Sequence, residues 1–134
     1  MEKEKLIFMK NFALENKGDF KKPNIVLDAE SGNCQVSGRS LMADPRGFYQ
    51  PVIDWLETYS QTQKYPLSWD FRIIYFNTGS QKALVLLLTK LQQINGLGID
   101  VKVNWHCHQD DNELMEDVEM LGEMADIPIW IKTA

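Results

Sequence analysis

Hydrophobic positions change their spacing along the chain, and these changes predict where strands and helices lie. Residues 25–27 and 34–36 are two short β-compatible runs around a turn-rich segment, which predicts a β-hairpin. From Phe48 onward, apolar positions at helical spacing alternate with strand-like runs. The expected helices cover about residues 48–59, 80–95 and 110–125, and the expected strands cover 67–76, 99–105 and 127–131.

The remaining segments give weaker patterns. Residues 6–10 predict a short edge strand, and residues 11–22 predict a loop that ends at Pro23. Residues 38–47 are a second expected loop. Pro51 fits the first turn of the helix that follows, where its missing N–H matters little, or it kinks that helix if the helix starts earlier.

The order of these elements predicts the fold class. Strands that alternate with helices after residue 48 imply right-handed crossovers and a mainly parallel sheet, led by the antiparallel hairpin. The chain has 134 residues, of which 44% are hydrophobic and 25% charged, as is ordinary for a soluble globular domain. We therefore expect one α/β domain over residues 1–134, with a mixed sheet and about three helices.

Charge and cysteine content narrow the possible functions. The formal net charge of −5 disfavours a protein that binds nucleic acid by neutralising phosphates. The longest apolar run, residues 83–88, is too short to span a bilayer, and the N-terminus lacks the features of a signal peptide. Cys34 and Cys107 lack CxxC spacing and are expected to be reduced, buried thiols. A cytoplasmic protein without membrane insertion is the expectation.

The junction at residues 77–81, Asn-Thr-Gly-Ser-Gln, is the most informative stretch for chemistry. Thr78 and Gln81 have capping-box spacing, so the simplest interpretation is that Thr78 only caps the helix. A hydroxyl here also faces the positive end of a helix dipole, which would favour a phosphate by roughly 0.3–1 kcal/mol. A phosphate-binding P-loop is disfavoured, because the stretch has a single glycine and no Gly-Lys-Ser/Thr ending.

The segment 105–111, Trp-His-Cys-His-Gln-Asp-Asp, offers an alternative function. His106 and His108 would share one face of a strand, and with Asp110 or Asp111 they could form the three-ligand zinc site of a small metal-dependent enzyme. The simpler interpretation is a strand end with solvated imidazoles and one buried thiol at Cys107. The chain has no GxSxG, no HExxH and no dinucleotide fingerprint, so we expect no enzyme, no metal and no cofactor.

The segment 109–126 carries eight acidic residues and no Lys or Arg. Its early acids suit a helix N-terminus, whereas Glu119 and Glu123 gain nothing from the helix dipole. The segment is either a solvated acidic face or a docking surface for a basic partner.

Several motifs in order resemble the SiaC family of bacterial regulatory phosphoproteins, from about Lys22 to the C-terminal end. The segments are Pro-Asn-Ile-Val-Leu-Asp (23–28), Gly-Arg-Ser (38–40), Phe-Tyr-Gln-Pro (48–51) with Trp55 and Tyr59, Tyr-Phe-Asn-Thr-Gly-Ser-Gln-Lys-Ala (75–83) and Val-Lys-Val-Asn-Trp-His (101–106). The resemblance implies a fold like the STAS domain and a non-enzymatic role in a partner-switching signalling module.

The resemblance also implies partners. A histidine-kinase-like protein kinase would phosphorylate Thr78, with Ser80 as the other candidate acceptor, and a metal-dependent serine/threonine phosphatase would remove the phosphate. The unmodified form would bind a target such as a diguanylate cyclase, which connects the chain with c-di-GMP signalling. We expect the partner surface to include the following residues: Arg39, Ser40, Asp44, Asn77, Thr78, Gly79, Ser80 and His106.

The chain departs from the family pattern at two places. Residues 41–44 read Leu-Met-Ala-Asp where the family usually has Tyr/Ile-Pro-Glu-Asn, which affects a loop expected to contact a partner. Gly79 stands where serine is common, which removes one competing hydroxyl beside Thr78.

Overall fold

The structure is a computed structural model that describes residues 9–134. Within these residues the chain forms six strands and three helices. In chain order they are β1 (Phe12–Leu14), β2 (Asn24–Leu27), β3 (Asn33–Ser40), α1 (Pro45–Thr62), β4 (Leu67–Phe76), α2 (Thr78–Gly96), β5 (Val101–Cys107), α3 (Asn112–Ala125) and β6 (Trp130–Thr133).

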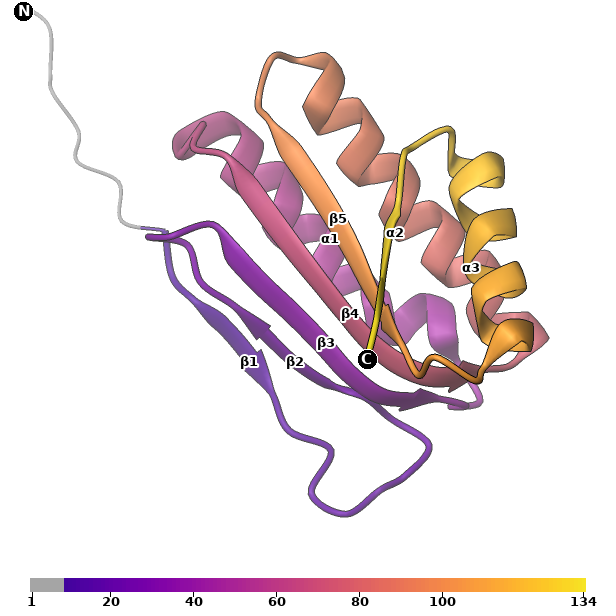
Figure 1. The fold of residues 1–134 in the computed structure, drawn as a ribbon. Coiled ribbons are helices and arrows are strands. Elements are labelled where there is room, and N and C mark those ends of the chain that lie inside the picture. Colours follow the sequence, from indigo (N-terminus) through magenta and orange to yellow (C-terminus); the bar gives the residue numbers. More distant parts are fainter. Residues whose placement is uncertain (1–8) are drawn as a thin grey trace, which may run out of the picture.

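The six strands form one sheet whose spatial order is the same as the chain order (Figure 1). The first two pairings are antiparallel, and the last three are parallel. Leu27 pairs with Cys34 across the β2–β3 connection, which confirms the predicted hairpin. The predicted α/β class, with an antiparallel start and a mainly parallel remainder, is therefore confirmed.

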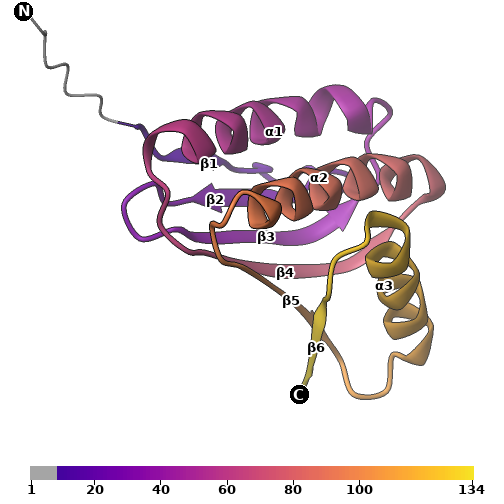
Figure 2. The same ribbon diagram turned by 90° about the horizontal axis from the view of Figure 1, so that it is seen from above.

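The three helices pack against one face of this sheet. Figure 1 shows α1 and α2 behind the strands and α3 to the side of β6, and Figure 2 shows α1 and α2 side by side above β3 and β4. Each crossover connects neighbouring parallel strands in the same direction along the sheet, so the helices share a face. Trp69, Phe71 and Trp105 are fully buried beneath them, and the rings of Phe71 and Trp105 stack at 4.5 Å. The opposite face of the sheet carries no helix among the described residues.

The N-terminal predictions need correction. A strand was predicted over residues 6–10. Residues 6–8 of it lie outside the described residues, and Met9 and Lys10 are not in a strand. Part of the predicted loop 11–22 is instead strand β1, since Phe12 pairs with Leu27 and Leu14 with Ile25. Three residues are too few to show alternation, so this strand depends on the edge that β2 offers.

The start of α1 also differs from the prediction. The helix begins at Pro45, and the Asp44 carboxylate caps it by accepting a hydrogen bond from the Gly47 N–H at 3.1 Å. Pro51 therefore lies inside the helix, so its placement in the first turn was wrong. Pro45 occupies that position instead, where a missing N–H costs nothing. The predicted loop 38–47 is shortened from both sides, because β3 extends to Ser40.

The last strand begins three residues later than predicted. Residues 127–129 pack against the end of α3, where the Ile127 N–H donates to the Gly122 carbonyl oxygen at 3.1 Å. Pairing with β5 starts only at Trp130. Apolar residues that cover a helix end and apolar residues in a strand look alike in sequence.

Cys34 and Cys107 are both free and buried, as predicted. Burial raises the pKa of the Cys34 thiol to about 12 and also raises the pKa of Cys107. None of the helices among residues 9–134 combines the length and the hydropathy that a membrane crossing requires.

Candidate functional site

The candidate site is the turn between β4 and α2. Asn77 has extended backbone angles and is the N-cap of α2, and its side-chain oxygen accepts a hydrogen bond from the Ser80 N–H at 2.9 Å. The predicted capping box of Thr78 and Gln81 is therefore wrong by one residue. The Gln81 amide instead approaches the sulfur atoms of Met120 and Met124 on α3, at 3.8 and 3.7 Å.

The two candidate phosphoacceptors differ sharply in accessibility. Thr78 is the first residue of α2 and is exposed, whereas Ser80 is fully buried. A kinase must reach the hydroxyl oxygen with the terminal phosphate of ATP, and of these two hydroxyl groups only that of Thr78 is accessible.

A chain of buried hydroxyl groups lies beneath the turn. The Ser40 Oγ lies 2.7 Å from the Tyr49 Oη and 2.8 Å from the Ser80 Oγ, and the Ser80 hydroxyl donates to the Ser40 carbonyl oxygen at 2.7 Å. Every hydroxyl donates once if Tyr49 donates to Ser40 and Ser40 donates to Ser80. Burial raises the pKa of the Tyr49 phenol, so this group remains protonated and able to donate. The network joins β3 and α1 to the first turn of α2.

The predicted segment 39–44 lies beside the turn. The Asn77 N–H donates to the Ser40 carbonyl oxygen at 3.3 Å, and Arg39 pairs in register with Tyr75. Asp44 caps the neighbouring helix, and a Cβ atom placed on Gly79 would lie 3.5 Å from the Pro45 ring. The structure thus brings together the residues predicted from two distant parts of the chain.

A β-bulge in β4 shapes the surface next to the turn. The register moves from Gly38–Ile73 to Arg39–Tyr75, so Ile74 is the extra residue. Ile74 and Tyr75 are more than half exposed. They border a small cavity of about 140 Å³, which is also lined by Phe76 and the following residues of the start of α3: Asp111, Glu113, Leu114 and Asp117. The hydrophobic pattern of the sequence does not predict this surface, because a bulge is visible only in the pairing with β3.

His106 lies elsewhere. Its Nε2 is 2.8 Å from the Asp70 carboxylate, on the helix-free face of the sheet. His108 is exposed, and its Nδ1 accepts from the backbone N–H of Asp110 at 3.1 Å. Of the residues proposed for a zinc site, His108 and Asp110 thus contact each other, whereas His106 contacts Asp70. Within residues 9–134 no three His, Cys, Asp or Glu side chains form a group that could hold a metal ion.

The electrostatic setting of Thr78 suits an anion. The helix that starts there has 19 residues and no acidic residue in its first turn, so its N-terminal N–H groups are not already compensated by a carboxylate. Lys82 lies one turn further along and is exposed. A phosphate on Thr78 would stay in solvent next to the positive end of α2.

Comparisons with known proteins show relatives of the chain in sequence and in fold. The chain resembles the solved structure of SiaC of Pseudomonas aeruginosa with a TM-score of 0.83 and 27% identity, covering 94% of this chain and 100% of that chain. SiaC in the crystal structure of the diguanylate cyclase SiaD in complex with its activator SiaC, from the same organism, gives a TM-score of 0.82 at 27% identity, over 92% of this chain and 99% of that chain. An uncharacterized protein of Pseudomonas aeruginosa (strain UCBPP-PA14) is 29% identical over 110 residues, which cover 82% of this chain and 87% of the relative.

The sequence profile described as "SiaC family regulatory phosphoprotein" matches residues 15–134, which include every element from β2 to β6 and the turn that carries Thr78. The chain belongs to the SiaC family of regulatory phosphoproteins.

Proposed function

We propose that this chain is a non-enzymatic switch protein, which binds a target protein when Thr78 is unmodified and releases it when Thr78 is phosphorylated. The observation that carries the proposal is the contrast between an exposed Thr78 at the start of α2 and a buried Ser80 two residues later. Residues 1–134 act as one regulatory domain in this proposal, since the described elements share a single hydrophobic core.

The proposed target is a diguanylate cyclase. The SiaC structure bound to SiaD, in which SiaC is the activator, supports this choice by likeness of fold and sequence. The proposed contact surface is formed by Asn77, Thr78 and Gly79 of the turn, with Arg39 and Asp44 beside it. Ser40 and Ser80 were expected in this surface, but both are fully buried and support the turn from beneath. His106 is an outlying part of this surface, because its ring lies against Asp70 on the helix-free face.

Two further partners complete the proposed cycle. A histidine-kinase-like protein kinase transfers the terminal phosphoryl group of ATP to the Thr78 Oγ1, and ADP and the hydroxyl proton leave. A metal-dependent serine/threonine phosphatase hydrolyses the phosphoester to restore the hydroxyl group and release inorganic phosphate. Because the kinase step consumes ATP, we place the cycle in the cytoplasm.

The phosphate would act at the interface itself. It adds a charge of about −1.5 to −2 and three strong acceptor oxygens at neutral pH. A target that covers the turn would bury this charge, and without a matching Arg or Lys the cost of removing its water exceeds what the remaining contacts return. We expect the target affinity to fall by a few kcal/mol, on the order of 10²-fold.

The test combines phosphosite mapping with target titration. After co-expression with the cognate kinase, the phosphate should map to Thr78, and Thr78→Ala should prevent its incorporation, while Thr58→Ala on α1 should not. Calorimetric titration of the target cyclase should then give tight binding for the unmodified form only. A phosphate on Ser80, or equal affinities of the two forms, would contradict the proposal.

A further inference from the structure

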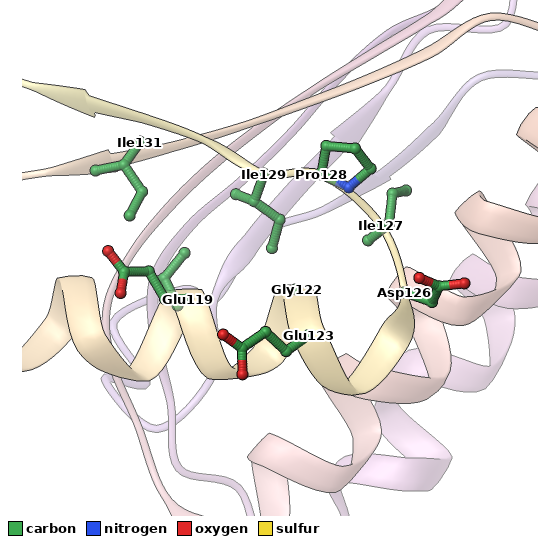
Figure 3. Close-up of a pocket in the computed structure, with 9 residues that line it drawn as sticks. Glu119, Gly122, Glu123, Asp126, Ile127, Pro128, Ile129 and Ile131 are labelled. Atoms are coloured by element: carbon green, nitrogen blue, oxygen red, sulfur yellow. The ribbon is translucent and has the colours of Figure 1, made fainter.

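A groove runs between α3 and the segment that returns from it to β6 (Figure 3). It has a volume of about 370 Å³, and Val118, Gly122, Ile127, Ile129 and Ile131 form its apolar lining. Gly122 allows the returning segment to approach the helix closely, since a Cβ atom there would lie 3.1 Å from the Ile127 carbonyl oxygen. The groove lies on the side of α3 away from the Met120 and Met124 contacts with Gln81.

The charged residues that line this groove are all acidic. Glu119, Glu123 and Asp126 line it, and Figure 3 shows the two glutamates along the helix beneath Ile129 and Ile131. Within residues 9–134, none of the three carboxylates forms an ion pair with Lys, Arg or His. Two of them lie near the C-terminal end of α3, which has no basic residue in its last turn, and there the helix dipole disfavours negative charge. These charges do not stabilise the helix, so a partner is the better explanation.

The groove opens beside an unpaired sheet edge. β6 is the outermost strand, and within the described residues no strand pairs with its outer side. Its backbone N–H and C=O groups on that side are available to an added strand. Ile129 and Ile131 point toward α3, whereas Trp130 is 58% exposed and lies 5.7 Å from the Lys102 ammonium and 5.9 Å from the Lys132 ammonium.

We propose that this groove, the α3–β6 groove, is a docking site for an extended segment of a partner protein that carries Lys or Arg at every second position and adds to the sheet beside β6. This site is separate from the Thr78 turn and goes beyond the proposed switch function.

Charge and side-chain spacing together select this occupant. Successive residues of a strand point to opposite faces, so every second side chain of the added segment would face α3. The long apolar stem of a Lys or Arg side chain would lie on Ile129 and Ile131, while its charged end reaches Glu119 and Glu123. The intervening side chains would lie beside Trp130 on the helix-free face, where β-branched apolar residues fit. An acidic segment would be repelled by the groove.

A peptide titration followed by NMR tests this inference with the full chain. The probe is a ten-residue synthetic peptide of alternating Lys and Val. It should shift the backbone amide signals of residues 129–133 and of Glu119 and Glu123, and it should slow hydrogen exchange at amides on the outer edge of β6. A peptide of alternating Glu and Val should produce neither effect.

Matched variants test the role of the acidic residues. Glu119→Gln with Glu123→Gln should weaken the peptide affinity by roughly 3- to 10-fold, in line with two partly exposed ion pairs. Glu30→Gln with Glu116→Gln removes two exposed acids outside the groove and should leave the affinity unchanged. Overlaid reference spectra of both double variants, apart from the replaced residues, would show that each is folded.

Three results would overturn the inference. They are equal binding by both double variants, signal shifts centred away from α3 and β6, and tighter binding of a basic amphipathic helical peptide of the same charge than of the alternating peptide. Because every arm uses unphosphorylated protein and no cyclase, a failure here is distinguishable from a failure of the Thr78 switch.

Discussion

The Ser80 hydroxyl donates a hydrogen bond to the Ser40 carbonyl oxygen at 2.7 Å, which ties the first turn of α2 to the end of β3. The contact joins residues 40 positions apart, and it fixes the turn from the side opposite to the exposed Thr78. The two hydroxyl residues therefore have different roles. Ser80 holds the turn in place, and Thr78 is exposed on its surface.

Ser80→Ala should therefore destabilise the fold without removing the phosphoacceptor. It leaves the Ser40 hydroxyl without its Ser80 acceptor in a buried site, at a cost of about 1–3 kcal/mol. Urea denaturation should show this loss, whereas phosphate incorporation by the kinase should persist in the folded fraction. Loss of phosphorylation with unchanged stability would show that Ser80, not Thr78, is modified.

Asn77→Ala should cost more stability than Thr78→Ala. Asn77 supplies the cap of α2, and replacing such a cap by alanine costs about 0.5–2 kcal/mol. Thr78 lies inside the helix at an exposed position, where alanine is a better helix former. Thermal melting of the two variants beside the unmodified protein checks the order. The reverse order would indicate that Thr78 caps the helix after all.

Phosphorylation of Thr78 should leave the melting temperature nearly unchanged. The added charge lies in solvent at the start of a helix with no acid in its first turn, so the helix dipole offsets part of its repulsion from the acidic protein. Differential scanning calorimetry of both forms measures this. A large drop would mean that the switch works by unfolding rather than at the interface.

Gly79→Ala should stabilise the protein by about 0.4–1 kcal/mol, because alanine has fewer unfolded conformations to lose. Its Cβ would make only ordinary contacts, with the Pro45 ring at 3.5 Å and the Asn77 side-chain oxygen at 3.8 Å. Gly32→Ala provides the contrast. Gly32 has a φ of +77°, and a Cβ there would clash with the Pro66 carbonyl oxygen, so this variant should melt at a lower temperature.

Stability should fall as the pH rises above about 8.5, the ordinary pKa of a free cysteine. Burial raises the pKa of Cys34 to about 12, so the folded state keeps its proton where the unfolded chain loses it. The unfolded state then binds fewer protons, and the free energy of unfolding decreases with pH. Urea titrations between pH 8 and 9.5 should show this decrease, and Cys34→Ala with Cys107→Ala should flatten it. An equal slope in the double variant would assign the effect to other groups.

The sequence predicted those features that depend on local pattern. The strand at residues 67–76 has the predicted bounds, because its aromatic and β-branched residues give a continuous signal. Asn77 and Thr78 are both good capping residues, so spacing alone could not choose between them. The choice follows from the way in which Ser80 and Ser40 anchor the turn.

The hydrophobic pattern does not predict contacts between residues that are distant in the sequence. The contact between His106 and Asp70 joins residues 36 positions apart. Asp70 lies outside the His106–Asp111 segment that suggested a metal site, so that motif does not point to it. The alternation of buried and exposed side chains along β4 places Asp70 on the polar face of the sheet. This alternation is the sequence signal that could have suggested a contact between Asp70 and His106. The bulge at Ile74 depends on the register between β3 and β4. The α3–β6 groove depends on how α3 ends. Neither property can be predicted from the type of a single residue.

The strands have the same order in the chain and in the sheet, which has a consequence for folding during biosynthesis. As the chain leaves the ribosome, each new strand finds its neighbour already made, and no strand must insert between two others. The sheet can grow from the β2–β3 hairpin by adding one strand and its covering helix at a time, with β6 last. Among the described strands, β6 is therefore the last to join the sheet, and the α3–β6 groove lies beside it.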